Sequence, residues 1–199
     1  MKCIRELFCA HASCKPVHGL VPDPFKIDQL EFPMTTSNLS YILDNIEIIG
    51  FNGRITSFYI NKNTDNLVFA FEVKNVTLAT PRLTIIFNRK GKEPIKLTDT
   101  FFTTFGSATF TATIPNIKHL QMDKAYAYAY LDDSNPDYDF GPGFWKSCDP
   151  IVSQESKSLL RNIPEISREA LIVQAFNYLK IFVQNTICDF GLPITNPRN

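Results

Sequence analysis

Few side chains in this 199-residue sequence have the types and the spacing that catalysis needs. The histidines His11, His18 and His119 lie far apart and show no spacing typical of metal ligands. No GxSxG, HExxH, GxGxxG or phosphate-binding loop motif occurs, and the two Asp-Phe-Gly triplets lack the other kinase motifs. The sequence therefore predicts a protein that is not an enzyme and that needs no cofactor.

An acidic segment follows the strand-rich part of the chain, with four aspartates between residues 132 and 139. Carboxylates could hold Ca²⁺, but their spacing here lacks the EF-hand pattern. We interpret residues 132–150 as a solvated surface loop pinned by Phe140, Phe144 and Trp145, and we expect no metal site.

A basic cluster surrounds Gly91, at the tip of a predicted hairpin. It consists of Arg89, Lys90, Lys92 and Lys96. Two interpretations are open: the cluster makes the hairpin end soluble, or it binds anionic groups such as the phosphates of lipid head groups. In the second case these four side chains form a head-group site.

Short strands separated by turn residues fill residues 39–131 and predict a meandering antiparallel sheet. Its last strand contains AYAYAY, which starts at Ala125 and places alanines on one face and tyrosines on the other. The alanines would let a helix approach closely or leave room for a guest molecule. Which face points inward stays open at this point.

One long helix is predicted over residues 164–190, beginning near Pro164 and ending before Gly191. Its apolar side chains share one broad face. The opposite face gathers the polar side chains Ser167, Gln174, Asn177, Lys180 and Gln184. With a short helix in residues 1–14, these elements predict a single α+β domain over residues 1–199, a curved antiparallel sheet wrapped around a long C-terminal helix.

An apolar face is expected where the predicted sheet meets this helix. Its members are Phe69, Phe71 and Phe110 on strands and Phe176, Leu179 and Phe182 on the helix. These side chains either fill a core or line an apolar cavity for a lipid-like ligand.

The charge balance argues against nucleic-acid binding, and the cysteines and sequons indicate the compartment of the protein. Lys plus Arg and Asp plus Glu both number 20, whereas a nucleic-acid-binding protein normally has a basic excess. No stretch is long and apolar enough to span a bilayer. Five cysteines and the glycosylation sequons at Asn38 and Asn75 favour a secreted, oxidised glycoprotein.

Three segments resemble the fibrohexamerin family, the small glycoprotein of silk fibroin. They are KCIRELFCAHASC, GLVPDPFKIDQLEFPMTTSNLSYI and the late NTICDFG. Residues 45–131 are also similar to takeout and juvenile hormone-binding proteins, whose curved sheet wraps a long helix and carries an apolar ligand. Their superfamily includes bactericidal proteins that bind lipopolysaccharide.

These resemblances imply two functions. The first is a secreted protein that binds lipid-like ligands or bacterial lipopolysaccharide, with an antibacterial role as one form of this activity. The alternative is a structural or assembly component that associates with silk fibroin chains.

The cysteine pairing follows partly from the same resemblance. We expect a disulfide between Cys148 and Cys188, because it would tie the helix to the sheet and juvenile hormone-binding proteins have a comparable staple. Among Cys3, Cys9 and Cys14 we expect one pair, with Cys3–Cys14 favoured, and one free thiol.

Overall fold

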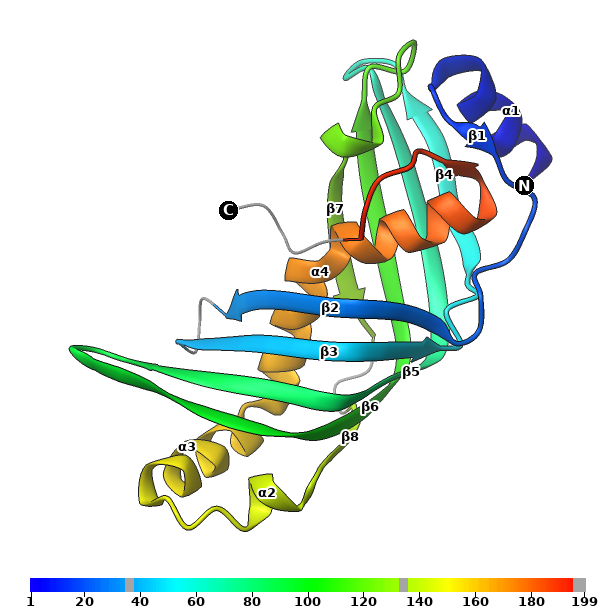
Figure 1. Cartoon of the computed structure of the whole chain (residues 1–199). Helices are drawn as coiled ribbons and strands as arrows, with labels where there is room; N and C mark the ends of the chain where they lie inside the picture. The colour runs from blue at the N-terminus through cyan, green and yellow to red at the C-terminus, as the bar shows by residue number, and fades with distance from the viewer. Residues whose placement is uncertain (35–37, 133–135, 195–199) are drawn as a thin grey trace.

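A computed structural model describes residues 1–34, 38–132 and 136–194 (Figure 1). Its helices are α1 (Lys2–His11), α2 (Pro142–Trp145), α3 (Pro150–Arg161) and α4 (Ile163–Thr186), with a 3₁₀ turn at Met122–Lys124. Its strands are β1 (Lys15–Pro16), β2 (Phe25–Met34), β3 (Leu39–Ile49), β4 (Arg54–Asn61), β5 (Asn66–Arg89), β6 (Lys92–Pro115), β7 (Tyr126–Leu131), β8 (Asp137–Phe140) and β9 (Cys188–Asp189).

The hairpin of β5 and β6 forms the centre of the sheet. Each of its two strands is 24 residues long and pairs with further strands along its outer edge. One edge of β5 pairs with β4 through residues 66–72 and with β3 through residues 77–87. The far edge of β6 pairs with β7 through residues 108–113 and with β8 through residues 101–104. The hairpin therefore connects two halves of one antiparallel sheet, one with β4 and β7 and the other with β3 and β8. Strand β2 pairs with the free edge of β3.

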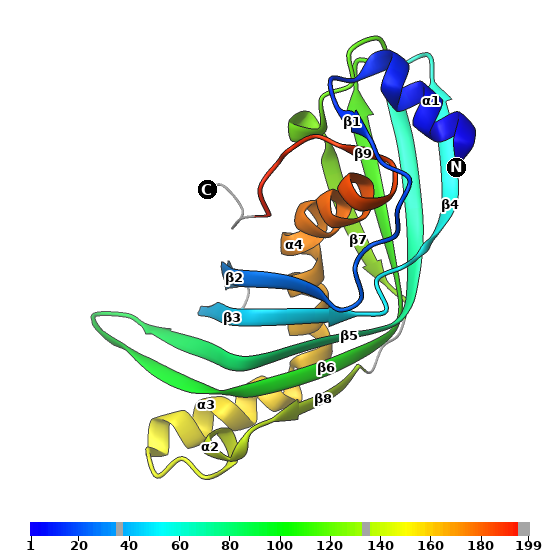
Figure 2. The same ribbon diagram turned by 45° about the vertical axis from the view of Figure 1, so that its right-hand side comes forward.

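The sheet curves around α4, which lies along its concave side in both views (Figures 1 and 2). This confirms the predicted fold class. The alternating strand β7 shows how the helix can approach: Ala129 is 2% exposed on the inner face, whereas Tyr126 is 70% exposed on the outer face. The small alanine side chains thus face the core, and α4 packs closely against β7.

Aromatic side chains fill the space between the C-terminal half of α4 and the sheet. The ring of Phe71 stacks on Phe182 with centroids 4.1 Å apart and planes at 11°, and on Phe110 with centroids 5.2 Å apart. Phe69 lies 6.1 Å from Phe182 on the same side. These contacts fix the helix against β5 and β6 by burying large apolar area and by favourable ring geometry.

The polar face predicted for the long helix is largely buried, which corrects the expectation that it faces solvent. Residues 188–194 fold back along α4 and cover the part of this face that carries Lys180 and Gln184. Lys180 is 5% exposed and donates from Nζ to the Pro193 carbonyl at 2.6 Å. Gln184 exchanges two hydrogen bonds with the backbone of Leu192, at 2.7 and 2.9 Å. Backbone groups of the returning segment therefore satisfy side chains that the sequence pattern assigns to water.

The ends of the helices also differ from the prediction. The segment before α4 is itself helical: Asp149 caps α3 by accepting from the amides of Ile151 and Val152, at 2.8 and 3.2 Å. Helix α4 ends at Thr186 rather than near residue 190. Two donors of the Arg5 guanidinium bind the Thr186 carbonyl at 2.8 and 3.0 Å, so α1 caps α4.

The predicted loop 132–150 contains two elements that pack on the sheet. Strand β8 pairs with β6, and α2 follows it. Phe140 and Phe144 are buried as expected, whereas Trp145 is largely exposed. The Phe144 amide donates to Asp99 Oδ2 at 2.7 Å, so an acidic side chain of β6 also holds this segment in place.

Candidate ligand-binding site

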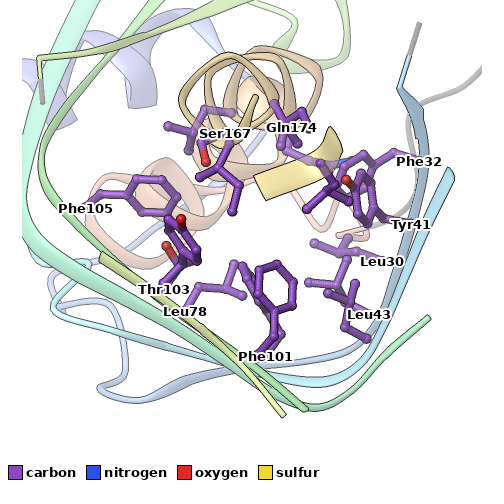
Figure 3. A pocket seen from close by; sticks show the side chains of 18 of the residues that line it. Leu30, Phe32, Tyr41, Leu43, Leu78, Phe101, Thr103, Phe105, Ser167 and Gln174 are labelled. Carbon is purple, nitrogen blue, oxygen red and sulfur yellow. The ribbon is translucent and has the colours of Figure 1, made fainter. Parts of the chain in front are cut away.

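An apolar cavity lies beneath the N-terminal half of α4, between that helix and the part of the sheet formed by β2, β3, β8 and the facing segments of β5 and β6. Figure 3 shows Ser167 and Gln174 on the helix side of the cavity and Leu43, Leu78 and Phe101 on the sheet side. The volume of the cavity is about 90 Å³. Its lining comes from β2 (Leu30, Phe32), β3 (Tyr41, Leu43), β5 (Leu78, Leu83), β6 (Phe101, Thr103, Phe105), β8 (Tyr138, Phe140), α3 (Leu159) and α4 (Ile163, Ile166, Ser167, Ala170, Leu171, Gln174, Tyr178).

An aromatic cluster lies at the end of the cavity near α2. The rings of Phe140 and Phe144 stack with centroids 4.1 Å apart, and Phe101 lies 4.9 Å from Phe140. Tyr138 lies 5.9 Å from Phe140 and is partly exposed, so it marks a place where the wall meets solvent.

The polar groups in the wall are few and uncharged. Thr103 is already paired, since its hydroxyl donates to the Asp137 carbonyl at 2.8 Å. Burial raises the pKa of Tyr178 to about 12. Burial also raises the pKa of Tyr41, and the nearby carboxylate of Glu169 raises it further. Both phenols therefore stay protonated and neutral at physiological pH.

The apolar residues expected to meet a ligand lie mostly in the solid core instead. Phe69, Phe71, Phe110, Leu179 and Phe182 are buried in the aromatic packing described above. None of these five side chains lines the cavity, and neither does the half-buried Phe176. Phe110 borders only a smaller void of about 10 Å³. Of the two interpretations open for this face, the structure therefore supports core packing.

The basic cluster lies at the tip of the β5–β6 hairpin, which projects beyond β2 and β3 (Figure 2). Arg89 pairs with Lys92 across the turn, where Gly91 adopts a φ of +69° that suits glycine. Lys90, Lys92 and Lys96 are exposed, and the Arg89 guanidinium donates to the Glu93 carbonyl. None of the four basic side chains lines the cavity, so a ligand held there would not meet them.

The disulfide in the structure joins Cys14 to Cys188, with 5.7 Å between their Cα atoms. The predicted pairs Cys148–Cys188 and Cys3–Cys14 are therefore wrong, and Cys3, Cys9 and Cys148 are free and exposed. The reason lies in the short pairing of β1 with β9, which brings Cys14 beside the end of α4. Sequence spacing does not show this pairing.

The two sequon asparagines lie at the surface. Asn38 and Asn75 are both exposed, with φ near +52°. Exposure is a condition for glycan attachment, and glycosylation at both positions remains a prediction. Among the described residues, no group of histidine, cysteine and acidic side chains has the geometry of a metal site.

Several cavity residues were missed because their elements were missed. Leu30 and Phe32 belong to β2, which lies outside the predicted strand region. The alternation of β2 breaks at Asp28 and Gln29, opposite Asn45 at a φ of +53°. The later alternation of Leu30, Phe32 and Met34 is the signal that could have revealed this strand.

The sequence profile of Fibroin P25 matches residues 1–192. The chain belongs to the Fibroin P25 family. No curated protein matches this Fibroin P25 sequence significantly.

The fold of this chain is also similar to that of a solved structure. The crystal structure of Epiphyas postvittana Takeout 1 matches with a TM-score of 0.56 and 14% identity, over 82% of this chain and 76% of that one. A crystal structure of lipopolysaccharide binding protein matches with a TM-score of 0.23 and 12% identity, over 90% of this chain and 37% of that one. The first shows a shared fold, and the second is too weak to support an argument.

Proposed function

We propose that this protein is a secreted, non-enzymatic binding protein that holds part of a lipid-like ligand in the cavity beneath α4. The observation that carries the proposal is the cavity itself, since apolar side chains from both sheet and helix form nearly all of its wall. Ligand sites are typically apolar hollows with a few fixed polar groups. The takeout-like fold and the absence of catalytic motifs fit the same function.

The size of the cavity limits the kind of ligand. Sites for drug-sized ligands usually measure about 300–1,000 Å³, whereas this cavity measures about 90 Å³. A slim apolar end, such as a short length of chain or a single ring, therefore enters the cavity while the rest of the ligand stays outside it.

Secretion is proposed on separate grounds. The disulfide between Cys14 and Cys188 fits an oxidising compartment, as do the exposed sequon asparagines. Among the described residues, no helix combines the length and the apolar character needed to cross a membrane.

Filling the cavity should weaken ligand binding strongly. Ala170 lines the cavity on α4, so Ala170→Phe places a ring in the space that the ligand would occupy. We expect the variant to bind the fluorescent apolar probe N-phenyl-1-naphthylamine at least roughly tenfold more weakly, a difference of about 1.4 kcal/mol. Fluorescence titration measures the affinity, and melting temperatures show whether both proteins are folded.

The matched control is Ile172→Phe, on the same helix but at an exposed position. This variant adds the same side chain outside the cavity and should bind the probe as the wild type does. Equal binding by wild type and Ala170→Phe would place the probe elsewhere and refute the cavity as the site. No binding by the wild type would also contradict the proposal.

The basic cluster provides a second, separable contact in this proposal, with anionic lipid or lipopolysaccharide surfaces. Changing Arg89, Lys90, Lys92 and Lys96 to Gln should weaken co-sedimentation with phosphatidylglycerol vesicles. Stability should change little, because exposed charges contribute little to folding. Wild-type binding should also fall with added salt, since the Debye length is about 8 Å at physiological ionic strength.

Phosphatidylcholine vesicles are the control for this measurement, because they carry no net charge. Salt-independent binding to acidic vesicles, unchanged in the quadruple variant, would remove the hairpin tip from the mechanism. An antibacterial role would then lose its support from this surface.

A structural role remains the second proposal, and the family match to Fibroin P25 favours it. The outer face of β7 offers a surface for it, with exposed Tyr126, Tyr128 and Tyr130 in a row. Capture of purified silk fibroin chains by the wild type, without any apolar probe in the cavity, would support assembly over ligand transport.

A further inference from the structure

One polar side chain in the cavity wall lacks a partner for its donor group. Gln174 is 2% exposed and its side chain extends from α4 toward the wall that carries Phe32 and Tyr41 (Figure 3). Its Oε1 accepts a hydrogen bond from Asn177 Nδ2 at 2.7 Å, which fixes the orientation of the amide. No acceptor among the described residues binds the Gln174 Nε2 group.

An unpaired amide donor at this depth is costly. Leaving a buried donor unsatisfied costs about 1–3 kcal/mol, and the large majority of buried polar side-chain atoms are paired in native structures. Leucine or methionine would fill the same position without that cost. Gln174 lines the cavity, and its donor is held in place by Asn177 without an acceptor of its own, so the donor is suited to an acceptor that arrives from outside.

The chemistry of the wall indicates what that acceptor is. None of the described residues that line the cavity is charged, so a carboxylate inside it would be buried without a counter-ion. The carboxylate of Glu169 already acts on Tyr41 in the wall, and it would repel a second negative charge. A neutral oxygen, such as the carbonyl of a ketone or an ester, meets the donor without these costs.

We infer that Gln174 is the specificity-determining residue of the cavity and that its Nε2 group binds a neutral carbonyl oxygen on an otherwise apolar ligand. This inference rests on the proposed function. It places the carbonyl beside α4, with the apolar end of the ligand against the strand side chains Leu43 and Leu78.

The test compares three probes of similar length that differ in their polar group: 2-nonanone, 1-nonene and octanoate. Binding is followed through the methyl shifts of Ala170 and Leu171 in carbon–proton spectra, which also report the location. The wild type should bind 2-nonanone roughly three- to tenfold more tightly than 1-nonene, as one net hydrogen bond provides. It should bind octanoate most weakly.

The variant Gln174→Met keeps the length of the side chain and removes the donor. It should bind 1-nonene at least as well as the wild type and lose the preference for 2-nonanone. Gln154→Met is the matched control, because Gln154 is exposed on α3 and outside the cavity. This control should keep the wild-type preference.

The outcomes separate this inference from the proposed function. If 2-nonanone and 1-nonene bind the wild type equally, or if Gln174→Met keeps the preference, the role of Gln174 is refuted while the cavity remains a binding site. Tightest binding of octanoate would refute the neutral acceptor. If no probe shifts the two methyl signals in the wild type, the proposed function and the inference both fail.

Discussion

Replacing Phe71 by alanine is expected to lower the free energy of unfolding by about 3–5 kcal/mol. Phe71 is 0% exposed and stacks on Phe110 and Phe182, so its removal opens a cavity between β5, β6 and α4. Such a loss is a large part of the roughly 5–15 kcal/mol that stabilises a typical domain. Urea denaturation followed by circular dichroism measures the change.

Tyr128→Ala is the control for this variant, because Tyr128 lies on the outer face of β7 and is exposed. Truncation at an exposed position usually changes stability by no more than about 0.5 kcal/mol. If Phe71→Ala cost no more than this control, the aromatic stack would not hold α4 to the sheet.

The second large effect concerns the Cys14–Cys188 disulfide. Its two cysteines are 174 residues apart in sequence, so in the chain-entropy model the crosslink contributes about 5 kcal/mol by restricting the unfolded chain. The double variant Cys14→Ala/Cys188→Ala should therefore unfold at a much lower urea concentration than the wild type.

The control is Cys3→Ala/Cys9→Ala, which removes two exposed free thiols and should leave stability nearly unchanged. A non-reduced peptide map gives an independent check, with Cys148 alkylated and one crosslinked pair of peptides. A crosslink that includes Cys148, or similar midpoints for the two double variants, would contradict the pairing.

The sheet and the first helix were predictable because local patterns encode them. Turn residues at Gly91 and the alternation in AYAYAY correctly indicate antiparallel strands around them. The expectation of short strands was wrong, because residues 66–89 and 92–115 each form one continuous strand of 24 residues. Ile4 and Phe8, on one face of α1, are the residues that this helix buries. In each case a single element carries its own signal.

The polar side of α4 was not predictable from periodicity. The helical spacing of Gln174, Asn177 and Lys180 predicts a face exposed to solvent, yet all three side chains are buried. What covers part of this face is the segment from 188 to 194, and no local pattern shows that a chain will fold back on a preceding helix. The disulfide partner of Cys188 was hidden for the same reason, because a two-residue pairing of β1 with β9 decides it.

The sequence predicts an apolar cavity as one of two interpretations, but it does not predict which residues line that cavity. The sheet-and-helix architecture suggests an apolar hollow, but its lining depends on which half of the sheet the helix fills. Phe71 and Phe182 are large enough to close the upper half completely. The cavity lies farther down, where Ala170 and Leu78 are among the residues that line it. The three-dimensional packing of the helix on the sheet, which the sequence pattern does not show, thus decides where a ligand fits.

The position of α4 has a consequence for the newly made chain. Every strand from β2 to β8 precedes α4 in sequence, so the ribosome completes the concave face of the sheet before its helical cover exists. Until residue 186 emerges, Phe69, Phe71 and Phe110 face water, and exposed apolar surface of this kind favours aggregation. A holding chaperone would protect the nascent sheet during that interval. Cys188 follows the end of α4 by two residues, so its bond to Cys14 can form only after the strands β1 to β8 and α4 have been synthesised.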